Sequence, residues 1–159
     1  MNLQAFIASV QRAIAALETA QPLAQLAARL YVAQAFFLSG LSKLRNWDST
    51  LALFQDEYQV PLLPPELAAV AGTTGELVLP LLLALGLAGR FAAAGLSVVN
   101  IVAVISLAEI AAPALQQHVF WGSLLVGLLL WGPGRWSVDH IVLPRLQGAA
   151  PRAGYTRAA

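Results

Sequence analysis

Four long apolar stretches limit what this chain can fold into. They cover residues 23–44, 66–87, 91–110 and 111–131, and the last could also begin at Ala114 because Pro113 leaves that boundary open. A transmembrane helix needs about 20 mostly apolar residues. Only 11% of the 159 residues are charged, whereas about 25% is typical of a soluble domain. The sequence therefore predicts an all-α membrane protein, a bundle of four transmembrane helices.

The segments on either side of this bundle have other patterns. Before it, apolar residues recur at helical spacing: Leu3, Phe6, Ile7, Val10, Ile14 and Leu17. Residues 1–21 are therefore predicted to form an amphipathic helix in the membrane interface, which Gln21–Pro22 would end. Residues 22–146 would form the membrane domain. The tail 147–159 is small and polar, and is predicted to be disordered.

The distribution of lysine and arginine predicts the orientation, because cytoplasmic loops carry more of them. With four spans, one side of the membrane holds Arg12, Arg90, Arg135, Arg145, Arg152 and Arg157. The other side holds only Lys43 and Arg45. Both termini are therefore expected in the cytoplasm, with the segment 45–65 outside.

Glu76 lies in the middle of the second apolar stretch, where a carboxylate is costly in lipid and needs a partner. By depth along their helices, Arg29 and Asn100 are candidate neighbours, at roughly the same level of the membrane. One interpretation is a buried Arg29–Glu76 ion pair that fixes the helices, with Asn100 as a hydrogen-bond partner. Another is a pocket for a small polar or amphipathic ligand, or a quinone head group. A proton-transfer role for Glu76 would need more titratable groups in line.

A second polar group follows the first span. Lys43, Asp56, Glu57 and Tyr58 are predicted to lie at the outer surface. They could form a docking surface or an entrance to the polar centre. The alternative is an interfacial anchor in which Lys43 extends toward water.

Several kinds of site are missing from the sequence. Cysteine is absent, which excludes disulfides and thiolate metal sites. His118 and His140 are expected on opposite sides of the membrane, so they cannot share a haem, and a metal site at His118 with Glu109 has little support. Neither a nucleophile–base arrangement nor a phosphate loop occurs, and no basic cluster indicates nucleic acid. No catalytic residue and no metal ligand are predicted, which favours a protein that is not itself an enzyme.

The order and spacing of several motifs resemble the DoxX family of small bacterial four-helix membrane proteins. The motifs are Arg29, Phe37-x-x-Gly40-x-x-Lys43-Leu44, Leu53-Phe54, Glu57-Tyr58-x-Val60-Pro61-x-x-Pro64, Glu76, Leu82-x-x-x-Gly86-Leu87-x-x-Arg90-x-Ala92-Ala93 and Gly132-Pro133-Gly134-Arg135-Trp136-Ser137-x-Asp139. The resemblance covers about residues 26–143. It implies a multi-pass protein of the bacterial inner membrane.

The resemblance also implies a class of function. The namesake is similar to a small membrane subunit of an archaeal thiosulfate:quinone oxidoreductase, and other members look like partners of redox-defence enzymes. This implies an accessory subunit of a redox or metal-stress system, with quinone as the candidate cofactor. The candidate partners are a redox enzyme or modified-peptide maturation proteins. A small-molecule carrier running past Arg29, Glu76 and Asn100 is one alternative, and a scaffold for a modified metal-binding peptide system is another. Ligand and oligomeric state are not predicted.

Overall fold

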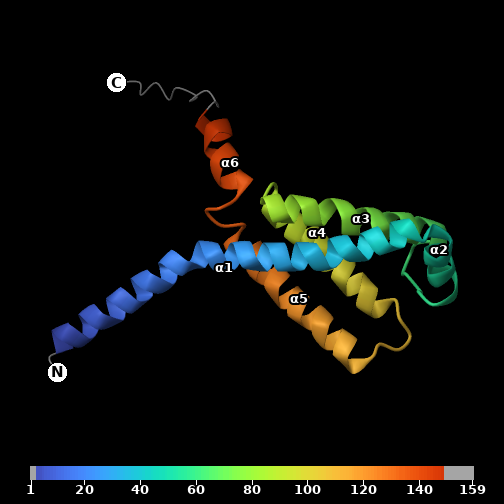
Figure 1. Ribbon diagram of the computed structural model, residues 1–159, viewed down its shortest axis with the longest axis horizontal. Coiled ribbons are helices and arrows are strands. Elements are labelled where there is room, and N and C mark those ends of the chain that lie inside the picture. The colour runs from blue at the N-terminus through green and yellow to red at the C-terminus, as the bar shows by residue number, and fades with distance from the viewer. Residues whose placement is uncertain (1–2, 149–159) are drawn as a thin grey trace, which may run out of the picture.

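The computed structural model describes residues 3–148, and the regular elements of that part are all helices. They are α1 (Leu3–Arg45), α2 (Trp47–Asp56), α3 (Pro65–Leu85), α4 (Gly89–Ile105), α5 (Ala112–Trp131) and α6 (Val138–Gly148). An isolated antiparallel bridge joins Tyr58 to Leu107, linking the α2–α3 and α4–α5 connections. The predicted all-α class is confirmed for the described residues (Figure 1).

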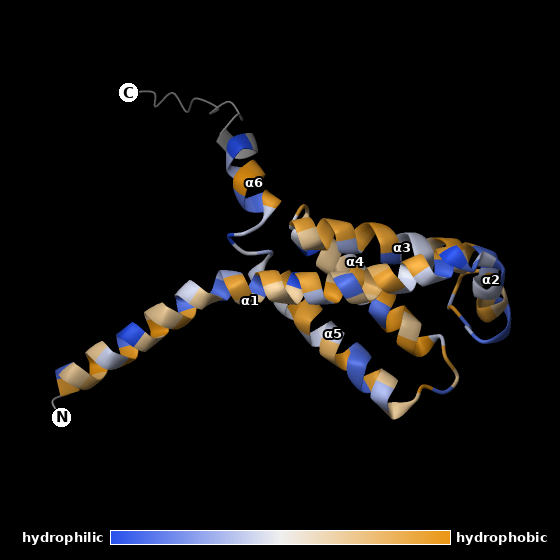
Figure 2. Ribbon diagram, in the orientation of Figure 1, coloured by the Kyte–Doolittle hydropathy of each residue, from blue (hydrophilic) through white to orange (hydrophobic). Residues whose placement is uncertain are grey.

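The helices differ in how well they could cross a membrane. By length and composition α3 and α5 qualify, whereas α4 is a shorter apolar helix of 17 residues, about 26 Å long. The part of α1 after Pro22 carries three charged residues, Arg29, Lys43 and Arg45. Apolar residues lie on the outward surfaces of α3, α4 and α5 (Figure 2), as expected where lipid replaces water. Two clear spans are thus observed, against the four that the sequence predicts.

The predicted break at Gln21–Pro22 is wrong, because α1 continues through Pro22 as one helix of 43 residues. A proline inside a helix removes one hydrogen bond and commonly bends the helix. Figure 1 shows such a change of direction between the N-terminal part of α1 and the rest. The apolar residues of this N-terminal part, Leu3 and Phe6 among them, are exposed, and the segment projects away from the bundle.

A short glycine-containing turn joins α3 to α4. Gly86 ends α3 with φ +66°, a left-handed conformation that favours glycine, and Leu87 N–H donates to the Leu82 carbonyl at 3.0 Å. Gly132 likewise ends α5 with φ +85°. Two short helices were not predicted: α2 within the segment 45–65, and α6 after Gly132. Since α6 reaches Gly148, it includes the first two residues of the predicted tail, and the rest of that tail lies outside the described residues.

Two apolar clusters hold the helices together. The larger lies between α1, α3, α4 and α5 and includes Phe36, Leu83, Leu96 and Leu125. The smaller joins α2 to the first part of α3 through Phe54, Ala68 and Ala69. The two ends of the bundle differ. We call the end with α2 the α2 end, and the end with the α3–α4 connection the hairpin end.

Candidate functional site

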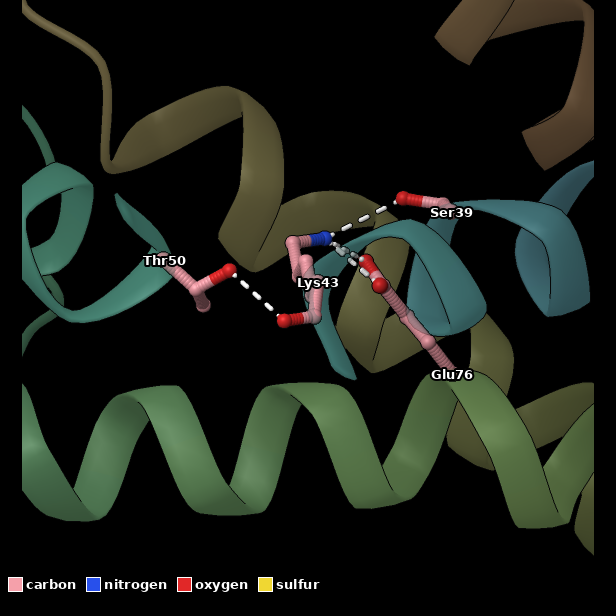
Figure 3. A network of polar contacts seen from close by, with 4 residues as sticks. All are labelled: Ser39, Lys43, Thr50 and Glu76. Atoms are coloured by element: carbon pink, nitrogen blue, oxygen red, sulfur yellow. Dashed lines mark hydrogen bonds and ion pairs between the residues drawn. The ribbon is translucent and has the colours of Figure 1, made fainter. Parts of the chain in front are cut away.

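Glu76 forms an ion pair with Lys43 inside the bundle. The Lys43 Nζ lies 2.5 Å from Glu76 Oε2 and 2.6 Å from Oε1, and it also donates to Ser39 Oγ at 3.1 Å (Figure 3). The side chains are 16% (Lys43) and 8% (Glu76) exposed. Because both charges are largely withdrawn from water, each depends on the other for its stability.

The close approach of α1 and α3 brings this pair together. Gly40 lies opposite Glu76, and a Cβ atom at Gly40 would be only 2.9 Å from Glu76 Cβ and 3.0 Å from Leu77 Cγ. Lys43 follows Gly40 by three residues, so it lies on the same face of α1. Its backbone carbonyl accepts a hydrogen bond of 2.9 Å from the buried Thr50 hydroxyl of α2. The sequence predicts Lys43 at the outer surface, whereas the structure encloses it in the bundle. The contacts of Lys43 with Ser39 and Thr50 have no signal in the sequence.

A cavity of about 180 Å³ adjoins the pair. Its polar lining consists of Lys43, Glu76, Tyr58 and Ser106, and most of the remaining wall is apolar. Burial raises the pKa of the Tyr58 phenol, and the Glu76 and Glu57 carboxylates raise it further. Tyr58 therefore stays protonated at neutral pH, with a hydroxyl able to donate a hydrogen bond. The cavity combines an apolar space with a charged pair and a phenol.

The predicted Arg29–Glu76 ion pair is wrong, because Arg29 binds backbone carbonyls at the hairpin end. Its Nη1 donates to the Pro133 carbonyl at 2.6 Å, and its Nη2 donates to Trp136 at 2.7 Å and to Ala84 at 3.4 Å. The residue is 1% exposed. Arg29 lies eleven residues from Gly40, about 16 Å along the helix, which puts Glu76 beyond its reach.

The α3–α4 hairpin and the α5–α6 connection both lie close to the Arg29 side chain. A Cβ at Gly86 would lie 2.6 Å from Arg29 Nη1, so glycine is needed there for space as well as for its positive φ. The Asp139 carboxylate accepts hydrogen bonds of 2.8 Å from the backbone N–H groups of Ala88 and Gly89 at the start of α4, where a negative charge is favourable. Arg29 and Asp139 thus join the α5–α6 connection to the α3–α4 hairpin.

Asn100 binds His118 and has no bond to Glu76 among the described residues. The Asn100 Nδ2 donates to the His118 carbonyl at 3.0 Å, and the Asn100 Oδ1 lies 2.8 Å from His118 Nδ1. The His118 ring packs edge-on against Trp121, which in turn contacts Phe36. This arrangement links α4 to α5. The three residues predicted as one polar centre therefore take part in three separate sets of contacts.

The residues predicted to form one outer-surface group also lie in two different places. Lys43 and Tyr58 face the cavity, whereas Asp56 and Glu57 are exposed at the end of α2. Over residues 3–148, no group of three or more histidine or acidic side chains could hold a metal ion. The chemistry of the site thus lies in one ion pair, one phenol and an apolar space.

These features define a helical membrane protein with a polar pair enclosed in its bundle. The DoxX family model matches residues 24–109, more than half of the chain, so the protein belongs to the DoxX family, as its motifs predict. DoxX is a family of membrane proteins, and the protein accordingly lies in a lipid bilayer. No curated protein and no solved structure matches the chain.

Proposed function

We propose that the protein is a membrane-embedded accessory subunit of a redox system, and that the cavity beside Lys43 and Glu76 holds the ring of a quinone. The observation that supports this most directly is the combination of an apolar cavity with an ion pair and a phenol on its wall. A cavity of about 150 Å³ can hold a benzene molecule, so about 180 Å³ suits a single substituted ring.

The chemistry of the wall suits a quinone. A quinone ring is apolar on its faces and carries carbonyl oxygens at its edge, which accept hydrogen bonds. The Tyr58 hydroxyl is a donor on the cavity wall, and it lies on the same wall as the Lys43–Glu76 ion pair, whose ammonium already donates to Glu76 and Ser39. We assign the protein a binding role, with the electron-transfer chemistry left to a partner enzyme. A carrier for another small amphipathic molecule would use the same cavity.

Co-purification tests this function. Protein extracted in mild detergent should carry quinone in organic extracts, and added quinone should quench tryptophan fluorescence, since Trp47 packs against the Phe54 cluster. Gly72→Leu should abolish binding by filling the cavity; even a Cβ at Gly72 would lie 3.5 Å from Phe54. Ala24→Leu adds a side chain in a groove elsewhere in the bundle and should bind normally. Equal binding by both variants would contradict the proposal.

We also propose that α1, α3, α4 and α5 all span a bacterial inner membrane, with both termini in the cytoplasm. Residues 3–21 of α1 would lie along the inner surface, since their apolar side chains are exposed and the segment leaves the bundle. α2 would then lie outside, with Asp56 and Glu57 as an acidic surface on which a partner enzyme or a modified-peptide maturation protein could dock.

Cysteine labelling tests this orientation directly, because the chain has no cysteine of its own. In intact cells Asp56→Cys should react with an impermeant maleimide, whereas Arg12→Cys should react only after the membrane is opened. The reverse labelling pattern would show that the protein has the opposite orientation in the membrane. If a partner covers the acidic surface, Asp56→Cys should react more slowly in native membranes than in the purified protein.

A further inference from the structure

Two grooves meet at the hairpin end, away from the cavity beside Lys43. The first has a volume of about 800 Å³ and lies between α1, the end of α5 and α6; its lining includes Arg90, Arg135 and His140. The second, of about 470 Å³, runs between α1 and α5. Gln21, Gln25 and Trp131 line both grooves. The two grooves are therefore continuous with each other.

The second groove is shaped for an extended apolar chain. It follows α1 from Gln21 to Ala28 and α5 from Trp131 back to Ser123, a length of about 10 to 12 Å. Between these ends small side chains leave the space open, namely Ala24, Ala28 and Gly127. The groove thus leads from the end of the bundle toward its middle.

The first groove is polar and partly cationic. Arg90, Arg135 and His140 line it, and so do the carboxylates of Glu18 and Asp139. Asp139 is already bound, because it accepts the backbone N–H groups of Ala88 and Gly89 and lies near Arg29. Glu18 is then the remaining carboxylate facing two arginines. With Arg29 beside Asp139, three arginines and two carboxylates lie at this end, and the balance of charge favours an anion.

Aromatic residues place this end at the surface of the bilayer. Trp131 is 75% exposed and Trp136 is 57% exposed, and exposed tryptophans collect at the depth of the lipid head groups. At this end α6 and the N-terminal part of α1 project away from the bundle (Figure 1). The cationic groove therefore lies where head groups lie, and the apolar groove lies where acyl chains begin.

We propose that an anionic phospholipid binds here, with its phosphate in the groove lined by Arg90 and Arg135 and one acyl chain between α1 and α5. A basic pocket between helices is suited to such a lipid. The lipid would fill the opening between α5 and α1 and hold α5 on the bundle. This site shares no lining residue with the cavity beside Lys43, so the two proposals can fail independently.

Native mass spectrometry of the full-length protein in mild detergent tests the proposal with phosphatidylglycerol and phosphatidylcholine of identical acyl chains. Phosphatidylglycerol should bind more tightly. Arg135→Gln should weaken phosphatidylglycerol about fivefold, since each basic residue near the surface contributes about that factor. It should weaken phosphatidylcholine less, because the choline ammonium offsets the charge of the phosphate. Because Arg135 is exposed, folding should be intact. Arg90→Gln should act in the same direction.

Matched controls decide between a site and a general surface charge. Arg145→Gln removes an exposed arginine of α6 that lies outside the groove, and it should leave both affinities unchanged. Ala24→Leu fills the acyl groove and should weaken both lipids. Equal binding of the two lipids, or an equal effect of Arg135→Gln and Arg145→Gln, would overturn the proposal. Displacement of phosphatidylglycerol by millimolar inorganic phosphate would also overturn it, because the site would then recognise a free anion.

Discussion

Lys43→Met should destabilise the protein by about 3–5 kcal/mol, since it leaves the Glu76 carboxylate buried without its partner. The Glu76 side chain is only 8% exposed, so little water can replace the lost ammonium. Replacing the whole pair, as in Lys43→Met with Glu76→Leu, should recover most of this loss, because neither charge then remains. Unfolding in mixed detergent micelles, followed by tryptophan fluorescence, measures both values.

The neighbouring residue Arg45 supplies the control for this experiment. Arg45 is exposed at the end of α1, so Arg45→Met should change the free energy of unfolding by no more than about 0.5 kcal/mol. If Lys43→Met were as mild as Arg45→Met, the ion pair would have no structural importance. The double variant also separates two roles of the pair: a folded double variant that has lost quinone binding would show that the pair contacts the ligand.

Arg29→Lys should destabilise the protein nearly as much as Lys43→Met, although it keeps the positive charge. Arg29 serves three carbonyls with a planar guanidinium, and the single ammonium of lysine cannot match that geometry. Each buried carbonyl that loses its donor costs about 1–3 kcal/mol, so a loss of about 2–4 kcal/mol is expected if two of the carbonyls lose theirs. The α5–α6 connection, which supplies two of the carbonyls, should loosen first.

Trypsin provides the measurement, because Arg135 is exposed within that connection. Cleavage after Arg135 should become much faster in Arg29→Lys than in the wild type, at a temperature where both remain helical. Arg90→Lys is the matched control, since Arg90 donates one longer bond of 3.3 Å to the Leu130 carbonyl. Equal cleavage in the two variants would show that Arg29 does not hold the connection.

The sequence predicts α3, α4 and α5 because each corresponds to a long apolar run. Gly86 and Gly132 end α3 and α5, through positive φ angles that glycine adopts easily. The short helices α2 and α6, of 10 and 11 residues, lack such runs. Pro22 was expected to end a helix, but the residues on both sides of it favour helix strongly enough to continue through it.

The partner of Glu76 was harder to predict, because the sequence gives the depth of a residue in the membrane only relative to the ends of its own helix. In the structure the two ends are not level. Gly40 lies opposite Glu76, with five further residues in α1 but eleven earlier residues in α3. α3 therefore extends past the end of α1 by roughly 9 Å, and α2 packs on the extension. Lys43 consequently lies deeper than its position in the sequence indicates, and Arg29 lies too far toward the hairpin end.

Lys43 is the only lysine in the sequence, and this gives the molecule a chemical reporter at its ion pair. Acylating reagents need a free amine, and the Lys43 amine is held by both Glu76 carboxylate oxygens and by the Ser39 hydroxyl. The rate of acylation at Lys43 would then measure how often its ion pair with Glu76 opens. The wild-type protein could be followed in this way in its own membrane, without any substitution.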